Sequence, residues 1–227
     1  MSTGVGLAVT VLVLVGVRAG MRVLPGRLHL VGGPVAAIVL LLLGRASGLS
    51  WRELGCGGGD ALVNGLRYAG EAAGLVVVAY GIGLLIPATR RALLDDRYRL
   101  GAGAALYTAL VAVPLATVLF EEVAFRGVVW GLVAQDRGAL WAAGVSSALF
   151  GLWHAVPSRT AGTASRARVL LTALGTVAFT ALAGLVLAGL RAAGGGLLAP
   201  IGLHWATNGL GVLAAATAWA IDRKPPR

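Results

Sequence analysis

Seven long runs of apolar residues are the feature that most limits how this chain can fold. The runs at 100–120 and 169–190 contain no charged side chain at all. About 20 consecutive apolar residues span the hydrocarbon core of a bilayer. Because an unpaired backbone polar group is not tolerated there, we expect each run to be a helix. The runs lie at 4–17, 28–44, 72–89, 100–120, 138–158, 169–190 and 194–221.

The predicted fold class is therefore all-α, a polytopic transmembrane helix bundle of about seven helices. The alternation of apolar and polar residues that a membrane barrel needs is absent from the runs. Charged residues make up 12% of the chain, about half their usual share in a soluble domain. No internal repeat or linker divides the sequence, so we expect a single integral membrane domain over 1–227.

The stretch at 50–68 does not follow this pattern. Trp51 and Tyr68 lie close to charged residues such as Glu53, and three glycines follow one another at 57–59. Aromatic residues beside charges are typical of the membrane–water interface. We therefore expect an interfacial loop with a short amphipathic helix here, and a third membrane helix that begins only at residue 72.

The formal net charge of +10 comes from basic residues in the predicted loops. No soluble module carries a basic stripe, so nucleic acid is not expected as a partner. The Lys and Arg residues gather after the first, third and fifth runs and in the C-terminal tail, which predicts a cytoplasmic C-terminus and an external N-terminus. The Ala-, Gly- and Arg-rich composition is typical of a GC-rich bacterial genome, so the predicted location is a bacterial inner (plasma) membrane.

Two adjacent carboxylates, Glu121 and Glu122, directly follow the uncharged run at 100–120. Charge inside a membrane span is costly and usually functional. Glu122 and Arg126 are spaced i, i+4 and share a helix face, as a buried ion pair requires. Glu121 lies about 100° further round the helix and has no such partner. An unpaired carboxylate in an apolar setting is suited to act as a general base.

Two of the three histidines fall in predicted membrane helices, each with a companion one turn away. His154 follows Phe150 by four residues, and Asn208 follows His204 by four. Taken alone, a membrane histidine is more often an interhelical hydrogen bond than a catalytic group, and a Glu–Arg pair can be purely structural. Three such clusters on core helices favour one shared polar site where the fourth, fifth and seventh helices meet.

These three motifs, in this order, resemble those of the CPBP family, which comprises the CAAX proteases and bacteriocin-processing (Abi) enzymes. They extend from Glu121 to Asn208, which suggests a catalytic core at about 100–221. The resemblance implies an intramembrane endopeptidase of the glutamate-dependent type. Glu121 with His154 would activate a water, while His204 and Asn208 would polarise the scissile carbonyl or hold the oxyanion.

The resemblance also implies supporting residues. Glu122 and Arg126 would orient their helix, and Phe150 would fix the ring of His154 by packing. Peptide hydrolysis needs a base, a water and oxyanion donors, and the candidate set supplies each kind of group.

The expected mechanism uses no metal and no other cofactor, although zinc is an alternative because two histidines and a glutamate can bind it. The sequence lacks a His-Glu-x-x-His motif, and the two histidines lie on separate helices. The single cysteine, Cys56, excludes an internal disulfide and a cysteine metal cluster.

Two other functions stay open on the sequence. A transporter or proton relay uses similar intramembrane residues, but it predicts inverted repeats and broken helices, which are not evident. A non-catalytic membrane scaffold or immunity protein would need the fold but not Glu121. The expected partners are the lipid bilayer and a membrane-anchored peptide or protein substrate. Prenylated substrates are not expected in a bacterium.

Overall fold

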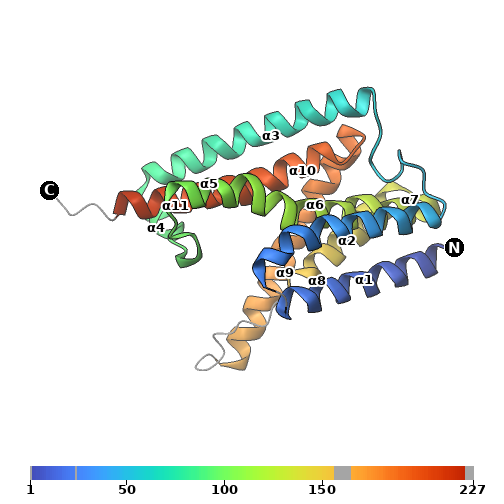
Figure 1. Ribbon diagram of the computed structural model, residues 1–227, viewed down its shortest axis with the longest axis horizontal. Coiled ribbons are helices and arrows are strands. Elements are labelled where there is room, and N and C mark those ends of the chain that lie inside the picture. Colours follow the sequence, from blue (N-terminus) through green and yellow to red (C-terminus); the bar gives the residue numbers. More distant parts are fainter. Residues whose placement is uncertain (1, 24, 156–164, 223–227) are drawn as a thin grey trace.

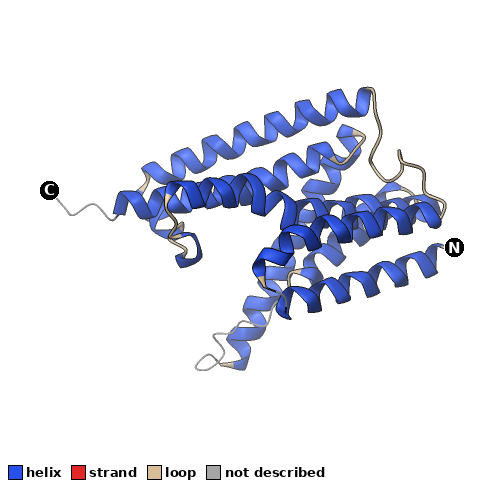
Figure 2. Cartoon of the chain, viewed as in Figure 1, coloured by secondary structure: helices blue, strands red, loops and turns tan. Residues whose placement is uncertain are grey.

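The computed structural model describes residues 2–23, 25–155 and 165–222, and these segments are helices joined by short loops. Figure 2 shows no strand among them. The N-terminal half contains α1 (Thr3–Val23), α2 (Gly26–Ala46), α3 (Asp60–Leu85), the short α4 (Pro87–Ala92) and the 3₁₀ turn η1 (Asp96–Tyr98).

The C-terminal half begins with one long rod, Ala102–Arg137. The rod consists of α5 (Ala102–Tyr107), η2 (Thr108–Ala112), η3 (Pro114–Val118), α6 (Leu119–Glu122), η4 (Val123–Val129) and α7 (Trp130–Arg137). Of these, η2, η3 and η4 are π-helical. The remaining elements are α8 (Ala139–Trp153), α9 (Arg166–Gly194), α10 (Leu198–Trp205), the π-helical η5 (Ala206–Leu210) and α11 (Gly211–Asp222).

Five of these helices are long and apolar enough to cross a bilayer, namely α1, α2, α3, the Ala102–Arg137 rod and α9. The shorter apolar α8 and the continuous stretch from α10 to α11 run between them. The start of α1 and the end of α11 lie at opposite ends of the molecule (Figure 1). The predicted all-α transmembrane bundle is confirmed.

The outer surface of the bundle is apolar. Leu75 and Leu85 on α3 and Phe179 on α9 are each at least 70% exposed. In water such a surface would aggregate, whereas in a bilayer it faces lipid tails of the same character. The core beneath it is made of Phe120, Phe125, Val128, Leu132, Leu40, Leu49, Leu54, Phe150 and Leu187 among others.

Several predicted helix boundaries are wrong. Helix α3 begins at Asp60, so no separate amphipathic helix precedes a membrane helix at residue 72. The carboxylate of Asp60 lies in the first turn of α3, where the helix dipole favours a negative charge. The charged Arg67 and Glu71 lie within the helix and not before it. They form an exposed i, i+4 pair with 3.7 Å between nitrogen and oxygen.

The fifth helix is also shorter than predicted. It ends at Trp153, and the rest of the predicted run, 156–158, lies outside the described residues. His154 is therefore the C-cap of α8 and not an interior helical residue. Its ring nitrogen and its backbone N–H both bond to carbonyls of the last turn, which is how a histidine closes a helix end. The seventh run likewise begins later, at Leu198, after Gly195 takes a φ of 68°.

Small residues bring the helices close together around the centre. A Cβ on Gly151 of α8 would lie 2.7 Å from the carbonyl oxygen of Val177 on α9. A Cβ on Gly202 of α10 would lie 2.3 Å from the Cβ of Ala69 on α3. Glycine thus permits backbone contact that no other residue would allow, as is common between membrane helices. These two contacts hold α8 and α10 against their neighbours, and both helices carry a candidate catalytic histidine near their C-terminal ends.

Candidate active site

The two adjacent glutamates lie inside the long rod, as predicted. Glu121 and Glu122 form the end of α6, with the π-helical η3 before them and η4 after them. They are 3% and 0% exposed, respectively. A π-helical segment contains more residues per turn than an α-helix and is frequently found at functional sites. Here both carboxylates face the interior, although they are neighbours in the sequence.

One oxygen of Glu122 accepts hydrogen bonds from both Arg126 and His204. Arg126 donates from Nη1 to Glu122 Oε1 at 3.1 Å, and both side chains are completely buried. His204 Nδ1 lies 2.7 Å from the same oxygen. The predicted Glu122–Arg126 pair is therefore present, and it also anchors the histidine of α10. The sequence spacing gave no sign of this second contact, which joins residues far apart in the chain.

Glu121 lies between the two histidines. Its Oε2 is 3.8 Å from Nε2 of His154 and 3.8 Å from Nε2 of His204. Its other oxygen, Oε1, accepts a hydrogen bond from Nε1 of Trp153 at 2.9 Å. Within the described part of the chain, Oε2 is buried and has no hydrogen-bond partner. One carboxylate oxygen is thus fixed by the indole, and the other faces both imidazoles.

The hydrogen bonds of the two histidines assign their ring nitrogens. His154 Nδ1 lies 2.8 Å from the carbonyl oxygen of Phe150, which can only accept, so Nδ1 must be the donor. His204 Nδ1 likewise donates to the carboxylate oxygen of Glu122. In both rings Nε2 is then left facing Glu121, and in a neutral imidazole this nitrogen carries the lone pair.

The ring of Phe150 packs against both histidines and against Arg126. Its ring lies edge-to-face with His154 at 4.6 Å and with His204 at 5.8 Å between centroids. The guanidinium of Arg126 lies 4.1 Å from the same ring, within the range of a cation–π contact. Phe150 therefore packs against His154 as predicted, and also against two residues that the sequence did not connect to it.

A cavity of about 530 Å³ opens onto the histidines between α3, α8, α9 and the α10–η5 stretch. His154 and His204 line it, and Asn208 on η5 lines the same cavity as an exposed residue. Tyr80 of α3 also lines it and donates its hydroxyl to the carbonyl of Thr207 at 2.8 Å. The four predicted catalytic residues therefore lie at one location, Glu121 behind the histidines and Asn208 in the cavity wall.

Two arginines, Arg126 and Arg191, join the rod to α9. The sequence analysis connected only Arg126 to the site. Arg126 donates from Nη2 to the carbonyl of Gly184 on α9 at 3.3 Å. Arg191, also on α9, donates to the carbonyl of Arg126 at 3.1 Å and to that of Glu53 at 3.0 Å. It thereby ties the loop before α3 to the rod. An arginine surrounded by uncharged carbonyls has no recognisable sequence motif.

A metal site was predicted to be absent. Within the described residues no group of three or more His, Cys, Asp or Glu side chains is arranged to hold a metal ion. The question of metal dependence stays a prediction, and an experiment for it is given below.

Comparison with known proteins identifies the family of the region that carries this site. No curated protein and no solved structure gives a significant match. Residues 103–210, from α5 to η5, match the family described as type II CAAX prenyl endopeptidase Rce1-like, and all seven candidate residues lie inside that range. The chain is therefore a multi-pass membrane protein, and its residues 103–210 match the CAAX protease (CPBP) family.

Proposed function

We propose that this protein is an intramembrane endopeptidase that hydrolyses a peptide bond of a membrane-anchored peptide or protein with a water activated by Glu121 and His154. The observation that carries the proposal is the position of Glu121 Oε2, which is buried, unpartnered among the described residues, and 3.8 Å from Nε2 of both histidines. A water bound to this oxygen lies within hydrogen-bond reach of either imidazole.

The reaction follows from the roles of these groups. The water donates one hydrogen to Glu121 Oε2 and the other to the lone pair of His154 Nε2. Its oxygen attacks the scissile carbonyl carbon while Glu121 takes the proton, and the carbonyl oxygen becomes an oxyanion. The same proton then passes to the leaving nitrogen as the C–N bond breaks, which returns the carboxylate to its starting form.

The oxyanion requires donors on the opposite side. Asn208 offers its side-chain amide from the cavity wall. His204 donates from Nδ1 to Glu122, and its Nε2 can donate to the oxyanion when the ring is doubly protonated. Preorganised donors of this kind commonly supply a large part of catalysis.

The test compares the termini of membrane peptides in cells that produce the wild-type protein and the Glu121→Gln variant. Glutamine retains the size and accepts the Trp153 hydrogen bond, but it cannot take the proton. Loss of a general base lowers a rate by about 10²–10⁴-fold, so cleavage products of the wild type should be absent from the variant. Glu71→Gln, on the exposed face of α3, is the matched control and should cleave normally.

The same comparison separates the enzyme from a scaffold. If Glu121→Gln cells contain the same new termini as wild-type cells, the glutamate-base mechanism is wrong. A scaffold or immunity protein would retain its phenotype in Glu121→Gln and lose it only in variants that no longer fold.

A further inference from the structure

A second cavity, of about 470 Å³, lies between α1 and α8, and Trp153 lines it. Its walls are apolar side chains of both helices, including Val11, Leu14, Leu149 and Leu152, with the buried Phe125 also lining it. Because Val11 and Leu152 are exposed at its edge, the groove opens at the surface of the bundle that faces the bilayer. We call this cavity the α1–α8 groove.

Among the described residues, one cation lines the α1–α8 groove. Arg18 belongs to the apolar span of α1 and lines the groove with its guanidinium 5.0 Å from the centre of the Trp153 ring. Each of the nine Asp and Glu residues of the chain lies in a described segment, and the ion pairs found among those segments include none with Arg18. No acidic side chain of this protein therefore neutralises it.

An unpaired arginine in a membrane span is costly and calls for an external anion. The groove provides what an amphiphile needs, since an apolar channel runs along α1 from Val11 and ends at the guanidinium of Arg18. Val11 and Arg18 are about 10 Å apart along the helix axis at 1.5 Å per residue. Basic pockets between transmembrane helices are typical sites for anionic lipid headgroups.

We propose that the α1–α8 groove binds an anionic phospholipid, with its phosphate at Arg18 and an acyl chain against the apolar walls. The bilayer is the one partner that the exposed edge of the groove meets along its whole length, which favours a lipid over a peptide. The bound lipid would rest on the ring of Trp153, whose indole N–H holds Glu121 Oε1. The site is independent of whether the proposed peptidase reaction occurs.

The test measures bound lipid and not cleavage. Purified protein is equilibrated in detergent with equal amounts of phosphatidylglycerol and phosphatidylcholine, and retained lipid is counted by native mass spectrometry. The wild type should retain phosphatidylglycerol in preference. Arg18→Gln should lower that retention about fivefold, the effect of one basic contact with an anionic headgroup.

Three further variants make the result specific. Arg168→Gln removes the same charge from an exposed residue at the start of α9 and should bind lipid like the wild type. Arg18→Lys keeps the charge and should retain phosphatidylglycerol. Ala19→Phe fills the groove without changing the charge and should lower retention. Thermal melting of each variant verifies that it is folded, and Arg18→Lys provides a charge-retaining comparison if Arg18→Gln is unstable.

Three outcomes would overturn the proposal. Unchanged phosphatidylglycerol retention in Arg18→Gln shows that the arginine does not bind the headgroup. Equal losses in Arg18→Gln and Arg168→Gln indicate a general effect of basic charge. If Arg18→Gln retains lipid but loses binding of an apolar peptide with a free C-terminal carboxylate, relative to the same peptide as an amide, the groove is a peptide site.

Discussion

Glu122 is the residue on which the geometry of the site depends. One of its oxygens holds both Arg126 on its own helix and His204 on α10. Among the described residues, its neighbour Glu121 has no ion partner within hydrogen-bonding distance, and its contact with the Trp153 indole is neutral. Two chemically identical side chains, one residue apart, therefore have different tasks. Glu121 is suited to take part in the chemistry, and Glu122 is suited to hold the other groups in position.

This difference predicts opposite effects of the same substitution. Glu122→Gln leaves the buried Arg126 without a counter-charge, and Arg126→Ala leaves the buried Glu122 with His204 alone. Breaking a buried ion pair in this way costs about 3–5 kcal/mol. Both variants should have a lower melting temperature in detergent. Glu122→Gln should also lower activity, because the group that accepts the hydrogen bond of His204 is then no longer a carboxylate. Glu121→Gln should melt like the wild type. Equal melting of Arg126→Ala and wild type would show that the buried pair contributes nothing to stability.

Metal dependence is also decided by individual residues. A zinc-activated water would need ligand nitrogens and oxygens at about 2.0–2.2 Å from the metal. In the proposed mechanism the nucleophile is a water held by Glu121 and His154 without a metal. We therefore expect that chelators leave cleavage by the purified protein unchanged. Inhibition that added zinc reverses would assign activation of the water to a metal.

At the scale of the elements, close packing of α8 against α9 positions His154. Gly151 lies three residues before it, and a Cβ there would press on the backbone of Val177 and on Ala181. The π-helical turns on either side of α6 orient both glutamates inward. The site is thus assembled by helix separation and rotation, and not by a single motif.

Gly151→Ala should therefore move α8 away from α9 and His154 away from Glu121. Overpacking of this kind costs about 1–3 kcal/mol, so we expect a lower melting temperature together with reduced cleavage. Gly144→Ala on the same helix is the control, because a Cβ there meets nothing within 4 Å. It should be neutral or slightly stabilising. Identical behaviour of the two variants would contradict the positioning role of this contact.

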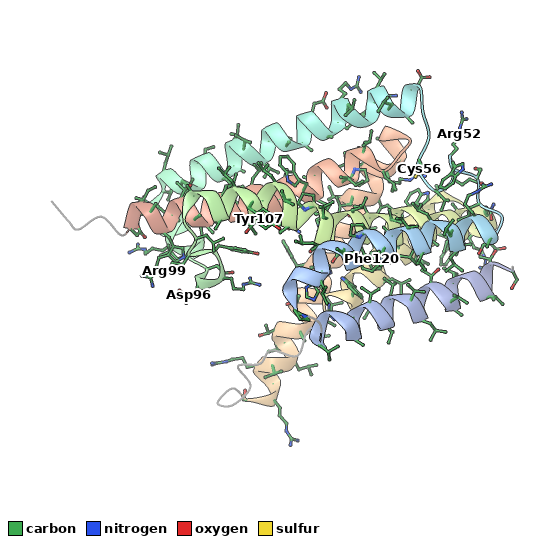
Figure 3. The ribbon with its side chains drawn as sticks, viewed as in Figure 1. Arg52, Cys56, Asp96, Arg99, Tyr107 and Phe120 are labelled. Atoms are coloured by element: carbon green, nitrogen blue, oxygen red, sulfur yellow. The ribbon has the colours of Figure 1, made fainter. Side chains whose placement is uncertain are left out.

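At the scale of the whole molecule, the loops divide between two ends. Cys56 lies in the loop before α3 and Asp96 in the loop after α4, and Figure 3 shows them at opposite ends of the molecule. Arg126 and Arg191 follow the fourth and sixth apolar runs, on the side that the sequence predicts to be external. Both are buried inside the bundle and do not belong to its loops. The predicted external side therefore carries still fewer basic loop residues, which agrees with an external loop at Cys56.

The orientation can be measured with the single native cysteine, which is exposed. A membrane-impermeant maleimide should label Cys56 in intact cells. Desolvation raises the pKa of the Cys56 thiol, so the thiolate fraction is small at neutral pH and labelling should accelerate as the pH rises. In the Cys56→Ser/Asp96→Cys variant, labelling should require permeabilised cells. The reverse pattern would invert the predicted topology.

The sequence by itself determined the fold class and the candidate residues. Charges are rare in apolar runs because burying them is costly, so Glu121, His154 and His204 were conspicuous. The Glu122–Arg126 pair was also predictable, since i, i+4 spacing is a local property of a helix. The predicted limits of α3 and α8 were wrong, because hydropathy does not show where an exposed ion pair continues a helix or where a histidine caps it.

Only the tertiary structure decided which of these residues contact one another. The contacts of Trp153 with Glu121, of His204 with Glu122, and of Arg191 with the rod all join different helices. Such contacts depend on the rotation and separation of each helix. Local periodicity does not encode them, because π-helical turns change the rotation and glycines change the separation. The position of Arg18 over Trp153 is decided in the same way, by the packing of α1 against the centre of the bundle.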